Sequence, residues 1–217
     1  DDKRLSVCEL LTKYPQGGEK QLIKAILNRE VPPKKLPAEV GVVVQNIQTV
    51  KAVHDAVVLG KPLTERVVSL AGNGIVNPGN YKIKLGTTFK DVFDKAGKSS
   101  SVIKKIVMGG PMMGISQYTL DVPVIKGTSG ILALTKEEIK KSKMYNCINC
   151  GRCIEVCPMN LMPQMYGKMS EINKWDEASE YNVADCMECG SCSYICPAKR
   201  PLNEAIKIGK AYLRSKK

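Results

Sequence analysis

The sequence predicts an α+β protein of several domains, and two observations support this prediction. Strand-like and helix-like patterns are mixed through about the first 135 residues, whereas helical patterns dominate afterwards. The helical part also holds eight of the nine cysteines. With 217 residues, 43% of them hydrophobic, the chain can bury a modest core in each of three units, whose expected bounds are 1–62, 63–135 and 136–217.

The first unit is expected to combine two helices with one strand. A double glycine precedes residues 19–30, where apolar side chains recur on one helical face, and residues 47–60 repeat apolar positions at the same spacing. Between these helices, the β-branched run EVGVVVQN at 39–46 predicts a buried strand.

The second unit is expected to be a small mixed sheet crossed by one helix. Short β-rich runs are separated by the turn signals GNG, NPGN and GGP, and the segment TFKDVFDKAG at 88–97 has the pattern of a helix. The expected strands lie within residues 65–72, 80–86, 103–110 and 122–127.

The third unit is expected to be helical, because glycine and β-branched residues become rare from Lys136 onward. Methionines and Trp175 occur at helical spacing between the cysteines, and we interpret them as core rather than as a docking surface. The expected helices are residues 135–144, 163–175 and 201–215.

Two cysteine runs share the spacing C-x-x-C-x-x-C-x-x-x-C-P: they are CINCGRCIEVCP at 147–158 and CMECGSCSYICP at 186–197. This spacing is typical of ferredoxins with two [4Fe–4S] clusters, in which the fourth cysteine of each run ligates the other cluster. The proline after the fourth cysteine fixes φ and turns the chain toward the other cluster. The predicted ligands are Cys147, Cys150, Cys153 and Cys196 for one cluster, and Cys186, Cys189, Cys192 and Cys157 for the second.

Electron transfer is the function that two such clusters predict, because four cysteine ligands leave no iron position open to a substrate. Gly151 and Gly190 would let the backbone approach the inorganic sulfides. Zinc, or a cluster of reduced thiols, is the alternative that the cysteines leave open. Clustered cysteines without a signal peptide also predict an intracellular protein.

The formal charge of +12 suggests an acidic partner, and nucleic acid is the first candidate. However, only 5% of the residues are aromatic, so few side chains could stack on bases, and most of the basic excess lies ahead of the cysteines. We therefore expect no nucleic acid partner. An iron–sulfur-stabilised nucleic-acid-binding module is the alternative from another class of protein.

Several uncommon strings occur in a fixed order: YPQGGEKQLI, GVVVQNIQTV, GKPLTERVVSLAG, NPGNYKIKLGT, GGPMMG and KGTSGILAL, followed by both cysteine runs. In this order they resemble the C subunit family of Rnf-type ion-translocating ferredoxin:NAD oxidoreductases, from about Leu5 to Tyr212. More distantly, the chain is similar to the flavin- and NADH-binding subunit of respiratory complex I and to a cobalamin-reductase subunit.

The resemblance implies the end of a Rossmann-like FMN/NADH domain at 1–62, a β-grasp domain of the soluble-ligand-binding kind at 63–135, and an α-helical ferredoxin domain at 136–217. It implies an electron-transfer subunit of a membrane-associated complex that translocates Na⁺ or H⁺. Electrons would pass between FMN/NADH and partner subunits through the two clusters. A cobalamin-reductase-type flavin and iron–sulfur subunit is the alternative.

The resemblance to complex I also implies flavin contacts near two motifs, although Gly18 and Gln45 depart from the complex I pattern. From the residues alone, the double glycine is a helix-start turn and Asn46 is a helix cap. The implied cofactor-binding residues are Gly17, Gly18, Glu19, Asn46 and Thr49.

The glycine-rich loop that holds flavin and nicotinamide in the family is expected upstream of these residues. We therefore expect this segment alone neither to retain FMN nor to oxidise NADH. The implied partners are the membrane and peripheral subunits of the complex, with FMN and NADH bound through the upstream region. All apolar runs are shorter than the roughly 20 residues that span a bilayer, so the implied location is peripheral, on the cytoplasmic side of the inner membrane.

Three remaining features are interpreted as structural. The segment GGPMMG at 109–114 opens no helix and predicts a turn. His54 is expected to be paired or solvated rather than to relay protons. Cys8 has no partner motif, and we expect it to be buried and inert.

Overall fold

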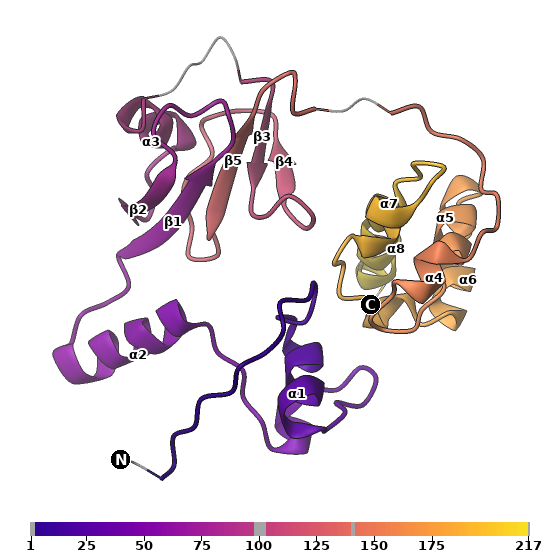
Figure 1. Ribbon diagram of the computed structural model, residues 1–217, viewed down its shortest axis with the longest axis horizontal. Helices are drawn as coiled ribbons and strands as arrows, with labels where there is room; N and C mark the ends of the chain where they lie inside the picture. Colours follow the sequence, from indigo (N-terminus) through magenta and orange to yellow (C-terminus); the bar gives the residue numbers. More distant parts are fainter. Residues whose placement is uncertain (1–2, 98–102, 140–141, 217) are drawn as a thin grey trace. The chain divides into compact units, whose positions relative to one another are not determined.

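The computed structural model describes residues 3–97, 103–139 and 142–216. Backbone contacts group the chain into two compact units (Figure 1). Gln45–Lys143 forms the sheet unit, and Asp1–Val44 together with Met144–Lys217 forms the cysteine unit. The finer division into three domains stays a prediction.

The sheet unit contains α2 (Ile47–Leu59), β1 (Glu65–Ala71), β2 (Gly79–Lys84), α3 (Phe89–Lys95), β3 (Lys105–Met108), β4 (Ile115–Gln117) and β5 (Gly130–Leu134). These strands form one open sheet in the order β2-β1-β5-β3-β4. β1 pairs in parallel with β5, and the other pairs are antiparallel, so the predicted mixed sheet is confirmed.

The predicted strands within 65–72, 80–86 and 103–110 are confirmed, whereas β4 and β5 were not predicted. The predicted strand within 122–127 is wrong. In that run the structure has only an isolated bridge between Pro123 and Thr88. The bridge is flanked by hydrogen bonds from the N–H of Phe89 to the Val122 carbonyl and from the N–H of Val124 to the Thr87 carbonyl. It does not extend into a strand because Thr88 is the residue that caps α3.

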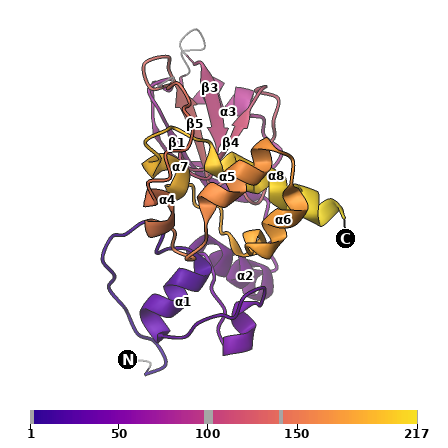
Figure 2. The ribbon, with the colours of Figure 1, turned by 90° about the vertical axis from the view of Figure 1, so that its right-hand side faces the viewer.

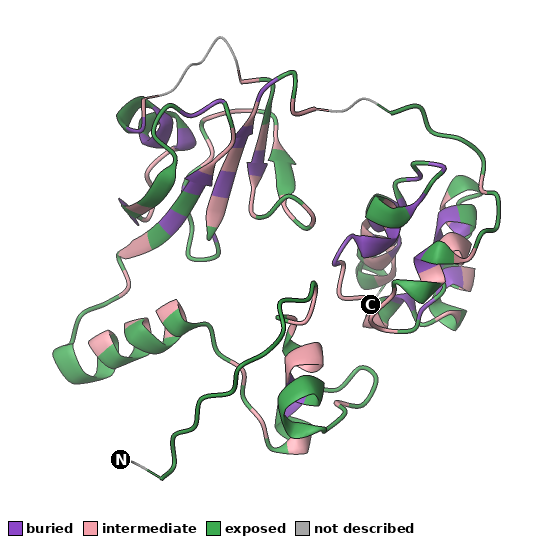
Figure 3. Ribbon diagram, in the orientation of Figure 1, coloured by how far each residue is buried: buried purple, intermediate pink, exposed green. Residues whose placement is uncertain are grey.

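The core of the sheet unit lies between the sheet and α3, which confirms the predicted helix within 88–97. Val68 and Leu70 alternate inward along β1, and Phe89 and Phe93 of α3 are fully buried in the same core cluster. Buried stretches lie on both β1 and α3 (Figure 3). Thr88 fixes the start of α3, because its hydroxyl accepts a hydrogen bond from the N–H of Asp91 at 3.2 Å.

The segment GGPMMG closes the hairpin between β3 and β4, so the predicted turn is confirmed. Gly109 has φ of 105°, a conformation that side chains rarely adopt. A side chain on Gly114 would collide with the carbonyl oxygens of Met108 and Gly110. The hairpin therefore requires glycine at both positions.

The cysteine unit contains α1 (Glu19–Leu27), η1 (Pro37–Val40), α4 (Arg152–Glu155), α5 (Pro163–Glu171), α6 (Trp175–Glu180), η2 (Val183–Asp185), α7 (Ser191–Ile195) and α8 (Leu202–Ser215). α5 and α8 lie side by side and carry much of the core (Figures 1 and 2). Tyr166 is fully buried, and Trp175 is 8% exposed. The interpretation of this stretch as core is thus confirmed.

The predicted helices at 163–175 and 201–215 are confirmed, except that the first is divided into α5 and α6. Asn173 has φ of 55°, a left-handed conformation that asparagine tolerates better than most residues. The chain changes direction at this residue, which lies between the end of α5 at Glu171 and the start of α6 at Trp175.

The strand predicted at 39–46 is wrong. The 3₁₀ helix η1 ends at Val40, and the chain then continues without regular structure to α2. Among the described residues no strand pairs with this run, and Val43 is 75% exposed. The β-branched composition favours a strand, but a strand needs a neighbour to satisfy its backbone groups.

The helix predicted at 135–144 is also wrong over its described residues, 135–139 and 142–144; residues 140–141 lie outside the described ranges. The Glu138 carboxylate accepts backbone hydrogen bonds from Thr135 at 2.8 Å and from Asn73 at 3.1 Å. These side-chain bonds stabilise a turn in place of a helix.

Across the part of the chain that the structure describes, no helix has both the length and the apolar composition needed to cross a membrane.

Candidate functional site

The two cysteine runs fold into the same local structure. Asn149 and Glu188 have φ of 55° and 59°, and Gly151 and Gly190 follow with φ of 77° and 81°. Each run then enters a short helix, α4 or α7. Two left-handed residues close together curl the chain around its own cysteines, and glycine accepts this conformation without strain.

Four cysteines line a first cavity, and they come from both runs. The cavity wall contains Cys147, Cys150 and Cys153 of the first run together with Cys196 of the second. Apolar side chains such as those of Ile148 and Leu202 complete it.

The other four cysteines line a second cavity, with the contributions of the runs reversed. Cys157 of the first run joins Cys186, Cys189 and Cys192 of the second. Tyr166 and Ile206 lie among the apolar residues of its wall. The cavities therefore group the thiols as the spacing predicts, with the fourth cysteine exchanged; that these thiols ligate iron stays a prediction.

The donor set fits iron–sulfur clusters. Four soft thiols line each cavity, and thiolates are the ligands that such clusters take. Burial raises the pKa of Cys186 to about 11 and that of Cys192 to about 12. These two thiols are therefore neutral at pH 7 in the metal-free chain, and metal binding has to displace their protons.

Two backbone N–H groups point at sulfur atoms of the second set. The N–H of Leu161 lies 3.4 Å from the Sγ atom of Cys157, and the N–H of Glu188 lies 3.3 Å from the Sγ atom of Cys186. Such donors stabilise thiolates and tune cluster reduction potentials.

Lys210, which lies on α8, contacts the loop of the second cysteine run. Its Nζ atom donates to the carbonyl oxygen of Cys186 at 2.7 Å and pairs with Glu188 at 2.5 Å. Sequence reasoning missed Lys210, because nothing in the spacing of α8 relates one of its lysines to a loop formed by an earlier segment.

The N-terminal segment of this unit packs against the second run. The Tyr14 hydroxyl donates to the carbonyl oxygen of Cys189 at 2.5 Å, and the N–H of Lys34 donates to the Asp185 carboxylate at 2.9 Å. A side chain on Gly18 would overlap the Met187 methyl group. The second cysteine set thus lies next to residues 14–34.

The residues implied to bind flavin fall into both units. Gly17, Gly18 and Glu19 belong to the cysteine unit, where Gly18 is the N-cap residue of α1. Asn46 and Thr49 belong to the sheet unit, where the Asn46 side chain caps α2 by accepting from the N–H of Gln48 at 2.9 Å. The interpretation as helix-start residues is confirmed, and the flavin contacts stay a prediction.

His54 and Cys8 line neither cysteine cavity. His54 is exposed and lies 3.3 Å from the Asp55 carboxylate, as expected of a paired histidine. The expectation that Cys8 is buried is wrong, since Cys8 is exposed. Residues 5–13 form no helix or strand, and apolar neighbours such as Val7 are also exposed, so no local core exists to cover the thiol.

Three known domain families match separate parts of the chain. The Nuo51 FMN-binding domain matches residues 1–55, the SLBB domain matches residues 67–116, and the 4Fe-4S dicluster domain matches residues 146–199. The predicted cofactors, FMN and two [4Fe–4S] clusters, are confirmed at the level of these family matches.

Similar proteins extend the comparison to nearly the whole chain. The C subunit of the Na(+)-translocating ferredoxin:NAD(+) oxidoreductase complex from Acetobacterium woodii is 50% identical over 210 residues, which are 97% of this chain and 47% of the relative. The proton-translocating counterpart from Clostridium ljungdahlii is 49% identical over 98% of this chain and 46% of its own. The C subunit of the ion-translocating oxidoreductase complex from Rhodobacter capsulatus is 45% identical over 70% of this chain and 29% of its own. The chain thus spans about half, or less, of the length of these relatives.

Proposed function

The chain is a homologue of the C subunits of ion-translocating ferredoxin:NAD(+) oxidoreductase complexes, and we propose that it carries electrons within such a complex. The observation that carries this proposal is the sorting of eight cysteines into two cavities, each lined by three thiols of one run and one of the other. A [4Fe–4S] cluster supplies one-electron chemistry when it is bound.

The protein's own residues would hold the clusters and exclude water from them. Cys153, Cys189, Cys192 and Cys196 are buried, so at least half of the eight thiols lie away from solvent. With four thiols assigned to each cluster, every iron has a protein ligand and no coordination position is left open to a substrate. This arrangement favours conduction over catalysis at the clusters.

The Nuo51 match supports the proposal that residues 1–62 form the end of a Rossmann-like FMN/NADH domain. The SLBB match supports a β-grasp fold for the sheet of the second unit. Gly17, Gly18, Glu19, Asn46 and Thr49 are then proposed to face the flavin. The chain would lie peripherally on the cytoplasmic side of the inner membrane. Its partners would be the membrane and peripheral subunits of the complex, with FMN and NADH bound through the upstream region.

Anaerobic reconstitution with iron and sulfide tests the proposal. We expect about eight irons per chain and spin-coupled EPR signals after reduction with dithionite, because two adjacent [4Fe–4S] clusters interact magnetically. The control is the same protein treated with zinc. About two tightly bound zinc ions that iron and sulfide cannot displace, with no EPR signal, would overturn the assignment and the electron-transfer function together.

The contact between Tyr14 and the second run predicts the effect of Tyr14→Phe. The variant loses one partly buried hydrogen bond, about 1 kcal/mol, so deuterium uptake in residues 15–27 of the reconstituted chain should rise about fivefold. Tyr118→Phe is the matched control, since Tyr118 is 99% exposed. Equal uptake in both variants would show that Tyr14 does not hold this segment against the cysteines.

A further inference from the structure

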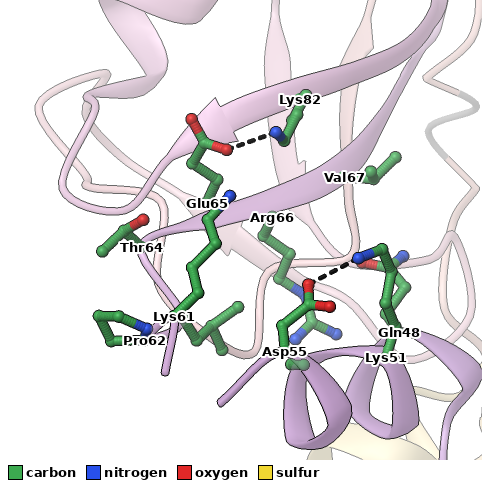
Figure 4. A pocket seen from close by; sticks show the side chains of 12 residues that line it. Gln48, Lys51, Asp55, Lys61, Pro62, Thr64, Glu65, Arg66, Val67 and Lys82 are labelled. Atoms are coloured by element: carbon green, nitrogen blue, oxygen red, sulfur yellow. Dashed lines mark hydrogen bonds and ion pairs between the residues drawn. The ribbon is translucent and has the colours of Figure 1, made fainter. Parts of the chain in front are cut away.

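The sheet unit contains a pocket that is separate from the cysteine cavities (Figure 4). It lies between α2, the linker that follows it, and the first two strands. The charged side chains of its wall are Lys51, Lys61, Arg66, Lys82, Asp55 and Glu65. Four basic and two acidic groups leave the pocket formally positive.

Both acidic groups are already neutralised by a lysine. Lys51 lies 2.6 Å from the Asp55 carboxylate, and Lys82 lies 2.5 Å from the Glu65 carboxylate, as the dashed lines in Figure 4 show. Hydrogen bonds from these lysines lower the pKa of each carboxyl group, so both stay ionised at neutral pH. Neither carboxylate is therefore free to form an ion pair with the remaining cations.

Arg66 and Lys61 are the remaining cations. Within the described ranges, neither side chain has an ion pair within 4 Å, although Lys61 is close enough to lower the pKa of Glu65. The Nε atom of Arg66 is buried and has no hydrogen-bond partner. A buried donor without an acceptor is costly. A ligand that drew the guanidinium toward the pocket and gave Nε an acceptor would therefore be stabilising.

The surrounding groups restrict the chemistry of that acceptor. Guanidinium and ammonium groups donate only, so the ligand must accept, and a positive site selects an anion. Gln48 and Thr64 add neutral donors, whereas Pro62 and Leu63 supply an apolar edge. The wall has no aromatic side chain on which a base could stack.

We propose that this pocket binds a phosphate dianion, free or at the end of a small phosphate ester, with Arg66 and Lys61 as its main ligands. Arginine matches the geometry of phosphate oxygens with a two-donor fork, and lysine adds a point charge. The proposal does not depend on the electron-transfer function, because the pocket uses none of the cysteines.

Titration of the reconstituted 217-residue chain with inorganic phosphate, by calorimetry at low ionic strength, tests the site. We expect saturable binding of one phosphate per chain that weakens with added salt. Glycerol phosphate and AMP form two further arms. Tighter binding of glycerol phosphate identifies an ester as the ligand, whereas equal affinities identify the phosphate group alone.

Substitutions connect the binding to these residues. Arg66→Gln is expected to weaken phosphate binding by about tenfold or more, because it removes both the charge and the fork. Arg66→Lys should lie between Arg66→Gln and the unmodified protein. Lys61→Gln changes an exposed linker residue, so it also tests the site if Arg66→Gln fails to fold. Lys90→Gln is the matched control, since Lys90 is exposed on α3, outside the pocket wall.

Two results would overturn the proposal. In the first, Lys90→Gln weakens binding as much as Lys61→Gln, which would mean that phosphate responds only to the general positive charge. In the second, malonate binds as tightly as phosphate and loses the same affinity in Arg66→Gln, which would identify a dicarboxylate site.

Discussion

Replacing Cys157 and Cys189 together by alanine is expected to leave about four irons per chain, whereas replacing Cys157 and Cys150 together should leave almost none. The first pair lies in one cavity, so both losses fall on the same cluster. The second pair is divided between the two cavities, so each cluster loses a ligand. Iron and sulfide analysis after anaerobic reconstitution, with EPR of the reduced protein, measures the difference.

The mirror-image pair of variants is the control. Cys196→Ala with Cys150→Ala should spare the second cluster, and Cys196→Ala with Cys189→Ala should spare neither. This design cancels differences in burial, since Cys150 is exposed and Cys189 is buried. If each run instead ligated its own cluster, all four outcomes would be exchanged. That result would contradict the ligand sets while leaving two clusters in place.

The grouping of the cysteines could be predicted because the spacing of ligands in one loop is a local property. Three cysteines at intervals of three residues, with a glycine directly after the second, determine how the loop curls. The helices α1, α2, α3 and α8 could be predicted for a similar reason, since the apolar spacing that marks a helix lies within a few residues. In α2 and α3 the capping side chains, Asn46 and Thr88, are equally local.

The failed predictions depend on partners that lie elsewhere in the chain. Residues 39–46 have the composition of a strand, but no described strand is available to pair with them. Residues 135–139 form a turn because Glu138 reaches the backbone of Asn73, far away in the sequence. β4 has only three residues, and β5 (GILAL) is apolar at every position after its glycine, so neither shows an alternation of apolar and polar residues.

The same limitation applies to the candidate site. The contacts of Tyr14 with Cys189 and of Lys210 with Cys186 join segments that are distant in sequence. Neither residue stands in a recognisable metal-binding pattern, so only the folded chain reveals their positions. The pocket around Arg66 has the same character, because its charges come from a helix, a linker and two strands.

Tyr166→Ala is expected to destabilise the cysteine unit by about 3–5 kcal/mol, the cost of deleting a large buried aromatic side chain. Tyr166 is fully buried, lines the second cysteine cavity, and donates a hydrogen bond from its hydroxyl to the carbonyl oxygen of Tyr181 at 2.5 Å. The loss should also open the second cavity to water. The second cluster should therefore bleach faster than the first under air.

Trp175 makes the measurement specific to this unit, because it is the only tryptophan and lies in the same unit as Tyr166. Its fluorescence should report a guanidinium midpoint lowered by about 1 M in the reconstituted Tyr166→Ala protein. Tyr166→Phe keeps the ring and leaves the Tyr181 carbonyl without its donor, so its loss should be smaller, about 1–3 kcal/mol. Tyr118→Ala, at an exposed position of the sheet unit, should leave the midpoint unchanged. An unchanged midpoint in Tyr166→Ala would mean that this ring does not stabilise the packing of α5 and α8. If Tyr166→Phe lost as much stability as Tyr166→Ala, the stabilisation would come from the hydroxyl rather than from packing.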